Sequence, residues 1–408
     1  MDKKKIATIV LFSVFIIGII WIACFEGKEE GSYVKKDEPI SYDEIRGVWI
    51  SYLELNTFLK GKNEAEFTKN VDNIINNMKS LNLNTMIIQV RSFSDAIYKS
   101  SIFPWSYLCT GTEGRDPGFD PLKIVIEEAH SKGIRVEAWI NPFRVRGKEL
   151  NREINDGNPA ASWIKSKSSN IITLDSGTYY NPGSQEVKEL VVNGISELVK
   201  NYAVDGIHFD DYFYPSTEAD IDAETYGAYL GSGGTLSLED WRRENINELV
   251  RAVYKEIKSI NSNVVFGISP QGSMSNNYNS QYIDVEKWVS NSGYVDYICP
   301  QIYYGFKNQG NNFKEALDKF SNIIKQDNIK LYIGLAAYKC GKEDTWAGEG
   351  KMEWIEEQGL LGKQIDASRE AAKYGGIMFF RYDSLFNPEE GVKNKVQGEV
   401  EEIKLRLK

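Results

Sequence analysis

Histidine and cysteine are scarce in this chain. Only two histidines, His130 and His208, occur among 408 residues, which excludes a histidine-rich metal site of the kind that metal-dependent deacetylases use. Of the four cysteines, one lies in the N-terminal segment, and the other three cannot form a fully paired disulfide framework or a zinc site. We therefore expect no metal and no cofactor, and the apolar core must supply the stability.

A strongly basic stretch is also missing. The net charge is −10 and the pI is about 5.1, which disfavours non-specific binding to nucleic acid. The chain is 42% hydrophobic and 26% charged, as is typical of a globular protein. Aromatic residues make up 12%, with 23 Tyr and 9 Trp. Their flat apolar faces and polar edges suit sugar rings as well as ordinary cores.

The N-terminus has the pattern of an export signal. Lys3–Lys5 precede an uncharged run of roughly 20 residues, Ile6–Phe25, nearly enough to cross a membrane as a helix. Residues 21–24, WIAC, resemble a lipoprotein signal in which Cys24 would be lipidated, although Trp21 differs from the small aliphatic residue expected there. The alternative is an uncleaved membrane anchor over residues 1–25. Either segment predicts a working domain outside the cytoplasm, tethered to the membrane.

Residues 26–43 are rich in Gly, Lys, Glu, Asp and Ser, which predicts a flexible tether before a domain over residues 44–408. In that domain, apolar strand-like runs alternate with helix-period segments, the signal for a parallel α/β fold. Eight such units predict a (β/α)8 TIM barrel with enlarged βα loops. A doubly wound sheet is the alternative, but no Gly-rich phosphate loop follows an early strand. The predicted strands are Ile45–Tyr52, Thr85–Arg91, Ile134–Asn141, Gly206–Asp211, Val264–Pro270, Val295–Tyr303, Leu331–Tyr338 and Gly376–Tyr382.

Helical periodicity fills the segments between these strands. The weakest pattern lies between the fifth and sixth strands, and the long loops Arg144–Tyr180 and Tyr212–Leu236 predict a small subdomain over the barrel mouth. The predicted helices are Glu64–Leu81, Pro121–Lys132, Ser184–Tyr202, Leu238–Ile260, Tyr282–Ser290, Asn312–Asp327, Ile365–Tyr374 and Pro388–Leu407.

The most informative run is residues 204–215, VDGIHFDDYFYP. It begins as a strand, with Ile207 and Phe209 on one side, and ends in the adjacent carboxylates Asp210 and Asp211. Neighbouring like charges at the end of an apolar strand cost stability. They can also hold two different protonation states, as acid/base chemistry requires. A helix cap or a calcium site would use such a pair too, and all three interpretations stay open from this run alone.

Polar residues gather at the inward positions predicted near the strand ends. In a TIM barrel these positions open onto the active-site face. Each unsatisfied buried polar group costs about 1–3 kcal/mol, so their convergence argues for a ligand site. Glu137, deeper in its strand, is expected instead to pair with Arg135 or Arg46, and His208 to be a core histidine that orients Asp210. The inward set is Gln89, Arg91, Arg135, Glu137, Trp139, Asn141, His208, Asp210, Gln301, Tyr303 and Arg381.

Short motifs spaced along the chain carry a family resemblance. They include RGVWI at 46–50, IQVR at 88–91, PGFDPL at 117–122, AWINPFR at 138–144, NPG at 181–183, GIHFDDYFYP at 206–215, WRREN at 241–245 and PQIY at 300–303. Together they resemble the glycosyl hydrolase-like 10 family of bacterial cell envelopes. The resemblance implies a (β/α)8 barrel that binds or cleaves glycans, and its envelope members are linked to peptidoglycan strands stripped of their peptides.

The working hypothesis is hydrolysis of a β-linked amino-sugar chain, with Asp210 and Asp211 as the catalytic carboxylates. Glycosidases need an acid for the leaving oxygen and a second group that stabilises the positive sugar centre. By resemblance to adjacent-aspartate hexosaminidase barrels, Asp210 would orient the substrate's own acetamido group and Asp211 would be the acid/base. The substrate-binding candidates are Arg91, Trp105, Asn141, Arg144, His208, Tyr212, Tyr214, Gln301, Tyr303 and Arg381.

Two alternatives remain open from the sequence. In the first, Asp210 is a covalent nucleophile and another loop supplies the acid, such as Glu244 or Asp383. In the second, the barrel binds glycan without cleaving it.

Overall fold

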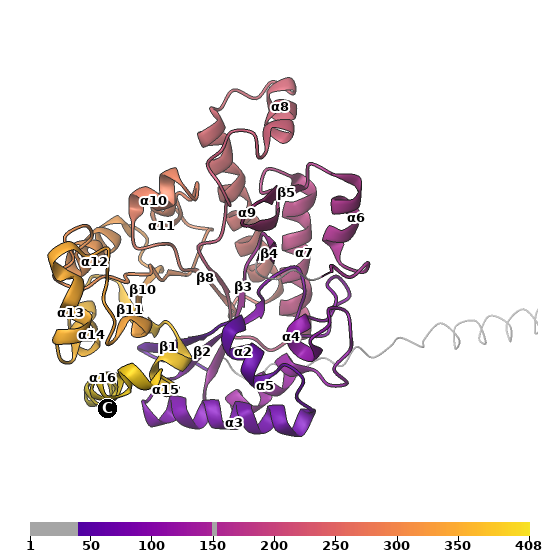
Figure 1. Cartoon of the computed structure of the whole chain (residues 1–408). Coiled ribbons are helices and arrows are strands. Elements are labelled where there is room, and N and C mark those ends of the chain that lie inside the picture. Colours follow the sequence, from indigo (N-terminus) through magenta and orange to yellow (C-terminus); the bar gives the residue numbers. More distant parts are fainter. Residues whose placement is uncertain (1–39, 149–152) are drawn as a thin grey trace, which may run out of the picture. The chain divides into compact units, whose positions relative to one another are not determined.

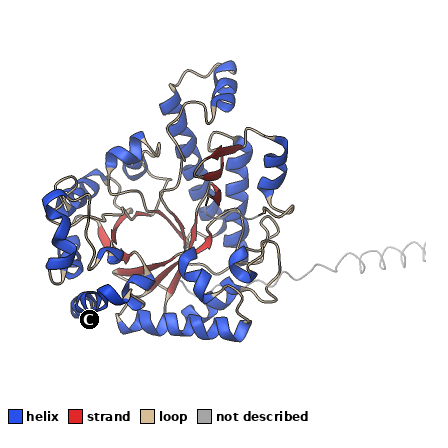
Figure 2. Cartoon of the chain, viewed as in Figure 1, coloured by secondary structure: helices blue, strands red, loops and turns tan. Residues whose placement is uncertain are grey.

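The computed structural model describes residues 40–148 and 153–408. The predicted export signal, Cys24 and most of the tether lie outside these residues. Eight parallel strands close into a barrel in the order β1–β11–β10–β9–β8–β7–β3–β2 (Figure 2). Because β1 pairs with both β2 and β11, the predicted TIM barrel is confirmed and the doubly wound sheet is excluded. The barrel strands are β1 Ile45–Ile50, β2 Thr85–Arg91, β3 Arg135–Ile140, β7 Gly206–Phe209, β8 Val265–Ile268, β9 Tyr297–Ile298, β10 Lys330–Leu335 and β11 Tyr374–Phe379.

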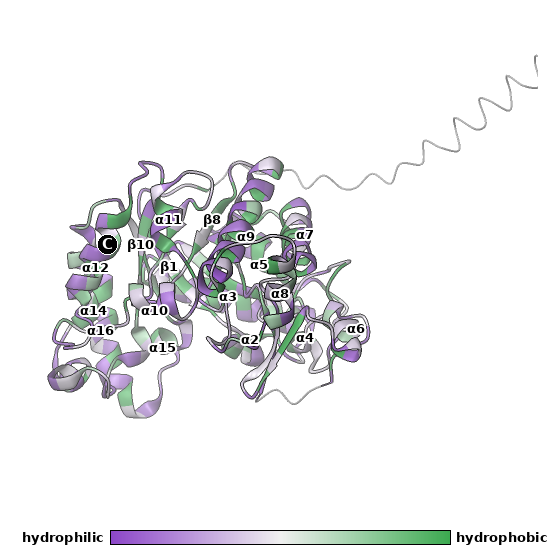
Figure 3. Cartoon of the chain, turned by 90° about the horizontal axis from the view of Figure 1, so that it is seen from above, coloured by the Kyte–Doolittle hydropathy of each residue, from purple (hydrophilic) through white to green (hydrophobic). Residues whose placement is uncertain are grey.

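Amphipathic helices surround the barrel, and hydrophilic and hydrophobic residues both occur along them (Figure 3). α3 shows how they begin and pack: Asn63 and Glu66 form a capping box at its start, and Phe67, Val71 and Met78 are buried along one side. The main helices are α3 Glu64–Ser80, α5 Pro121–Ser131, α7 Gln185–Asn201, α9 Leu238–Ile260, α11 Val285–Ser290, α12 Phe313–Ile323, α14 Leu360–Arg369 and α16 Lys393–Arg406.

One of these helices is displaced from its predicted position. α14 begins at Leu360 rather than Ile365, directly after its N-cap residue Gly359 in the αL conformation. It also ends before Tyr374, because that residue already belongs to β11. Within the described residues, none of the helices combines the length and the apolar character needed to span a membrane. Shorter helices lie in the loops: α2 Tyr52–Phe58, α4 Tyr107–Thr110, α6 Pro159–Ser166, α8 Ala223–Gly231, α10 Met274–Asn279, α13 Glu353–Glu356 and α15 Tyr382–Phe386, with 3-10 turns at Ala337–Lys339, Gly348–Met352 and Glu390–Val392.

The two long loops build additions at the C-terminal ends of β3 and β7. The first forms an antiparallel sheet in the order β4–β6–β5 (β4 Arg144–Gly147, β5 Ile171–Leu174, β6 Gly177–Tyr180). Helix α6 packs beside the β5 edge of this sheet. The second carries α8, which extends from the end of α9 (Figure 1), where the Tyr226 and Trp241 rings lie 5.2 Å apart. A hydrogen bond of 3.1 Å from Asn181 to Thr225 links the two additions.

The barrel interior combines apolar filling with a polar layer. Trp49, Ile87 and Trp139 belong to the inner cluster together with Tyr297. Gly267 on β8 makes room for that tyrosine, since a Cβ at Gly267 would lie 1.9 Å from its ring. The Tyr297 side chain therefore extends across the barrel interior, and its hydroxyl donates a hydrogen bond to Glu137. As predicted, Glu137 is fully buried and pairs with Arg135, at 3.6 Å, and not with Arg46, which bonds Glu44.

Candidate active site

A cavity of about 320 Å³ opens at the C-terminal ends of the barrel strands, and both adjacent aspartates line it. TIM-barrel enzymes carry their active sites at this C-terminal face of the barrel, because the βα loops there vary in sequence without disturbing the core. The predicted residues that it brings together are Asp210, Asp211, Arg144, Tyr212, Gln301 and Tyr303; Trp49, Ser51, Tyr52, Leu53, Gln89, Trp139, Ser269 and Phe380 complete the lining.

Asp210 lies at the bottom of this pocket and is 4% exposed. Its Oδ2 accepts hydrogen bonds from Trp139 Nε1 at 2.9 Å and from Asn141 Nδ2 at 3.3 Å. Its Oδ1 accepts a bond of 3.2 Å from the backbone N–H of Tyr212. Donors from the end of β3 and from the loop after β7 thus hold the carboxyl group in one orientation. Asn141, predicted to contact substrate, is itself buried and positions Asp210.

Asp211 is the second residue of the loop after β7 and is more accessible than Asp210. Gln301 donates to its Oδ1 at 2.9 Å. Burial raises the pKa of Asp211, and burial together with the Asp211 charge raises the pKa of Asp210 to about 7. Since the two carboxyls repel each other when both are ionised, their titrations are coupled, and protonation of one of them is favoured toward neutral pH. That is the state in which one group can donate a proton while the other acts as a carboxylate.

His208 lies below the pocket and does not contact Asp210. It is 0% exposed, and burial lowers its pKa to about 3, so the ring is neutral. Its Nδ1 donates to the Tyr297 hydroxyl at 2.7 Å, and its Nε2 accepts from Trp49 Nε1 at 3.2 Å; this tautomer is the one that lets Tyr297 donate to Glu137. The predicted core histidine is confirmed, but its predicted substrate contact and its orientation of Asp210 are wrong.

Arg144 and Tyr212 form one rim of the pocket. The Arg144 guanidinium lies 5.2 Å from the centre of the Tyr212 ring and 4.4 Å from that of Phe93. Its Nε is buried and has no hydrogen-bond partner among the described residues. Tyr212 is 51% exposed, so its ring is accessible from the pocket, and its stacking on a sugar stays a prediction.

Tyr303 and Phe380 form the opposite wall. Their rings stack at 5.8 Å, and Tyr338 contacts both edge-on. Burial raises the pKa of Tyr303 well above its usual value, so its hydroxyl stays protonated and can donate to a ligand. Phe380 and Trp49 were not predicted to line the site, and Trp139 was predicted only to face the barrel interior. The RGVWI and AWINPFR motifs contained the two tryptophans, but only the closed barrel shows that their rings reach the cavity.

Arg91 does not point into the barrel, and this prediction is wrong. A bulge shifts the β2 register between Gln89 and Arg91, which turns Arg91 outward. Its guanidinium lies 4.5 Å from the Phe103 ring and approaches Gly194 of α7. A strand residue keeps its predicted face only where the pairing is regular.

Tyr214, Trp105 and Arg381 also lie away from the pocket. Tyr214 is buried, with its ring 5.2 Å from that of Tyr282. Trp105 packs against the core outside the barrel. Arg381 is held by Glu54, which is buried beneath the first turn of α2. None of the three lines the pocket, so the structure does not bring these predicted substrate-binding residues together with the aspartate pair.

Neither acid proposed for a covalent mechanism lines the pocket. Glu244 on α9 pairs with Lys287 at 2.7 Å, and Asp383 borders a separate small cavity beside Arg381. Among the residues of the lining, only Asp210 and Asp211 are carboxylates. Across residues 40–148 and 153–408, no three His, Cys, Asp or Glu side chains are grouped as metal ligands. The chemistry that this arrangement supports is acid catalysis by the pair.

Comparison with known proteins agrees with the motifs. Residues 44–348 match the glycosyl hydrolase-like 10 family. The chain belongs to this family. Glycosyl hydrolase YngK of Bacillus subtilis (strain 168) is 32% identical over 377 residues, which cover 86% of this chain and 71% of the relative. Glycosyl hydrolase DigH of Escherichia coli (strain K12) is 34% identical over 340 residues, 77% of this chain and 75% of that protein.

The barrel of this glycosyl hydrolase-like 10 protein also resembles solved glycosidase structures. The glycoside hydrolase domain of PgaB (BpsB) from Bordetella bronchiseptica aligns with a TM-score of 0.58 at 13% identity, covering 86% of this chain and 98% of that one. At so low an identity the likeness concerns the fold.

Proposed function

We propose that this protein is a glycoside hydrolase that cleaves β-linked amino-sugar chains of the cell envelope, with peptide-free peptidoglycan strands as substrate. The observation that carries the proposal is the pair Asp210–Asp211, buried in a strand-end pocket with raised pKa values. Ionisable groups tuned toward neutral pH are typical of catalytic acids. Family membership supports a glycan substrate, and the resemblance of the motifs implies the peptide-free strands.

Asp210 is placed to orient the acetamido group of the sugar. Three donors already favour its ionised form, and an acetamide N–H would be a fourth. Binding of the acetamide would therefore stabilise the Asp210 carboxylate and shift the shared proton to Asp211, nearer the solvent. Asp211 then has the protonation state that a general acid needs.

The reaction proceeds in two steps. The acetamide oxygen attacks the anomeric carbon and forms a cyclic oxazolinium ion, while the glycosidic bond breaks and Asp211 gives its proton to the leaving oxygen. Water next attacks the same carbon, Asp211 takes the proton, and the ring opens to restore the acetamide. Both carboxyls end in their starting states, so the protein is regenerated without a cofactor.

The test is incubation with purified peptide-free strands, followed by mass analysis of the products. We expect shorter fragments with their acetyl groups intact, each cleavage adding the mass of one water. Strands bound but returned at full length would instead select a non-catalytic glycan-binding barrel, and loss of acetyl groups would select deacetylation.

Tyr303→Phe tests the role of the wall hydroxyl. Tyr303 is placed to donate to the acetamide oxygen as charge develops on the sugar, and one such donor contributes about 10²–10³-fold to kcat. We expect that loss in kcat with little change in KM, measured by steady-state kinetics. Tyr338→Phe, on the neighbouring ring, is the matched control, and an equal loss in both variants would contradict the role.

Tyr212→Ala tests stacking at the rim. Because half of this side chain is exposed, its removal should leave the fold intact and weaken sugar binding by about 1 kcal/mol, a fivefold rise in KM. Tyr212→Phe keeps the ring and should keep the KM. A fall in kcat at constant KM would instead assign Tyr212 to the chemical step.

The proposed substrate also fits the proposed location. If residues 1–25 act as an export signal or anchor and residues 26–43 as a tether, the barrel works outside the cytoplasm at the membrane surface. Fractionation of cells, with a Cys24→Ala variant to separate lipidation from an uncleaved anchor, tests this placement.

A further inference from the structure

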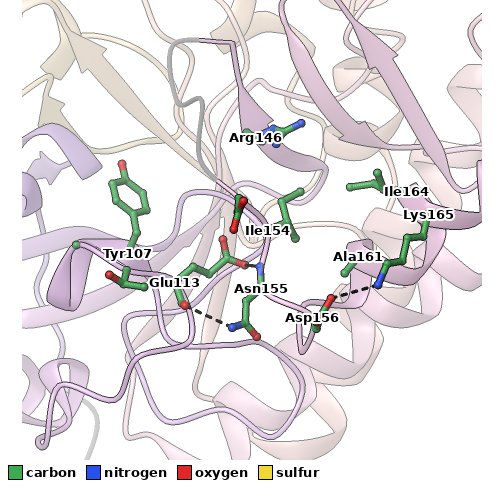
Figure 4. Close-up of a pocket in the computed structure, with 12 residues that line it drawn as sticks. Tyr107, Glu113, Arg146, Ile154, Asn155, Asp156, Ala161, Ile164 and Lys165 are labelled. Carbon is green, nitrogen blue, oxygen red and sulfur yellow. Dashed lines mark hydrogen bonds and ion pairs between the residues drawn. The ribbon is translucent and has the colours of Figure 1, made fainter.

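A larger cavity, of about 740 Å³, lies beside the catalytic pocket. Tyr107 and Glu113, from the segment after β2, lie on one side of it, and Ala161, Ile164 and Lys165 of α6 lie on the other (Figure 4). Its place next to the catalytic pocket, and not its size, suggests what it does.

The two cavities are neighbours along β4. Arg144 lines the catalytic pocket, and Arg146, two residues further along β4 and beyond a bulge in its pairing with β6, lines the larger cavity. Between them lies Phe93, whose ring is 4.4 Å from the Arg144 guanidinium and 6.1 Å from the Tyr107 ring. The Phe93 ring thus contacts one lining residue of each cavity, which makes the two cavities neighbours on either side of that ring.

The lining of the larger cavity suits a hydroxylated ring. Tyr107, Ala161 and Ile164 provide an apolar wall for the C–H face of a sugar. Charged and polar groups border that wall: Asp156 lies 3.5 Å from Lys165, and Glu113 accepts a hydrogen bond from the Asn155 backbone N–H. A cavity that offers both hydrogen-bond donors and acceptors, with charges of both signs, favours hydroxyl and amide groups, because these groups both donate and accept hydrogen bonds. It is less suited to a phosphate or a polycation.

We propose that the larger cavity is a second sugar subsite, which holds an amino-sugar unit of the chain whose neighbouring bond lies at Asp210 and Asp211. The proposal rests on the proposed function of the catalytic pocket. The subsite makes the protein selective for longer substrates. Strands long enough to fill both cavities are bound and cleaved better than a single sugar that fills only the catalytic pocket.

Ala161→Trp tests this proposal because the indole would fill the cavity from α6. The substrates are long peptide-free strands and a short aryl N-acetylglucosaminide. We expect kcat/KM for the strands to fall about tenfold or more, the loss of roughly 1.4 kcal/mol of binding, with turnover of the aryl substrate within twofold of the native protein. The matched control is Ser162→Trp, at the adjacent exposed position, which should change neither.

Equal effects of Ala161→Trp on both substrates, or none on the strands, would overturn the subsite while leaving the proposed function intact. If the native protein cleaves neither substrate, the proposed function fails, and calorimetric binding of the strands to the native protein and to Ala161→Trp then decides the subsite. If Ala161→Trp does not fold, Ile164→Ser, which removes apolar wall without adding volume, must show the same selective loss.

Discussion

The variant Asp211→Asn is expected to have a kcat on glycan strands about 10²–10⁴-fold lower than the native protein, the usual contribution of a general acid. The Asp211 carboxyl is the accessible member of the pair, and asparagine keeps its shape and its contact with Gln301 but cannot donate the proton. Steady-state turnover of peptide-free strands measures the loss. KM should change little, because the ground-state contacts of the sugar remain.

A substrate with a good leaving group separates the two aspartates. An aryl N-acetylglucosaminide with an acidic phenol needs little protonation, so Asp211→Asn should retain much of its native rate there. Asp210→Asn should lose activity on both substrates, since the acetamide is no longer held by a carboxylate. The control is Asp318→Asn at an exposed position of α12. The same loss for Asp211→Asn on both substrates would contradict its role as the acid.

Asp210→Asn is also expected to stabilise the protein at alkaline pH. The folded state raises the pKa of Asp210 from 3.8 to about 7, so it binds that proton more tightly than the unfolded chain does. This favourable contribution is complete below pH 3.8 and is lost as the pH rises through about 7. At pH 8 the native protein therefore carries a buried charge that asparagine lacks.

We expect the free energy of unfolding of Asp210→Asn to exceed that of the native protein by about 2–4 kcal/mol at pH 8, at 1.4 kcal/mol per pKa unit. Near pH 4 the difference should shrink to less than about 1 kcal/mol. Urea denaturation at the two pH values measures it, and Asp318→Asn should differ from the native protein by no more than about 0.5 kcal/mol at either. A destabilised Asp210→Asn that is equally destabilised at both pH values would contradict the raised pKa.

Regular strand geometry explains which site residues could be predicted from the sequence. Alternation along β3 and β7 placed Trp139 and Asp210 on the inner face, and the barrel confirms both. The same rule failed at Arg91, because a bulge in β2 interrupts the alternation, and a bulge depends on the neighbouring strand as well as on the strand's own residues.

Other errors arose from contacts between distant segments. Glu54, buried under α2, captures Arg381 across more than 300 residues of chain, and Tyr297 reaches across the barrel to take the hydrogen bond of His208. Tyr214 follows the pair in a motif that suggested stacking, yet it packs against Tyr282 and Arg242. Residue type and spacing predict that a polar group needs a partner, whereas the partner's identity comes from the tertiary fold.

The pair Asp210–Asp211 carries the functional account, and one comparison tests it most directly: shortening of peptide-free peptidoglycan strands by the native protein and by the double variant D210N/D211N, with strand binding measured in parallel. We predict that the native protein releases acetylated fragments while the double variant binds the strands and releases none. Equal release of fragments by both proteins would show that the catalytic groups lie elsewhere.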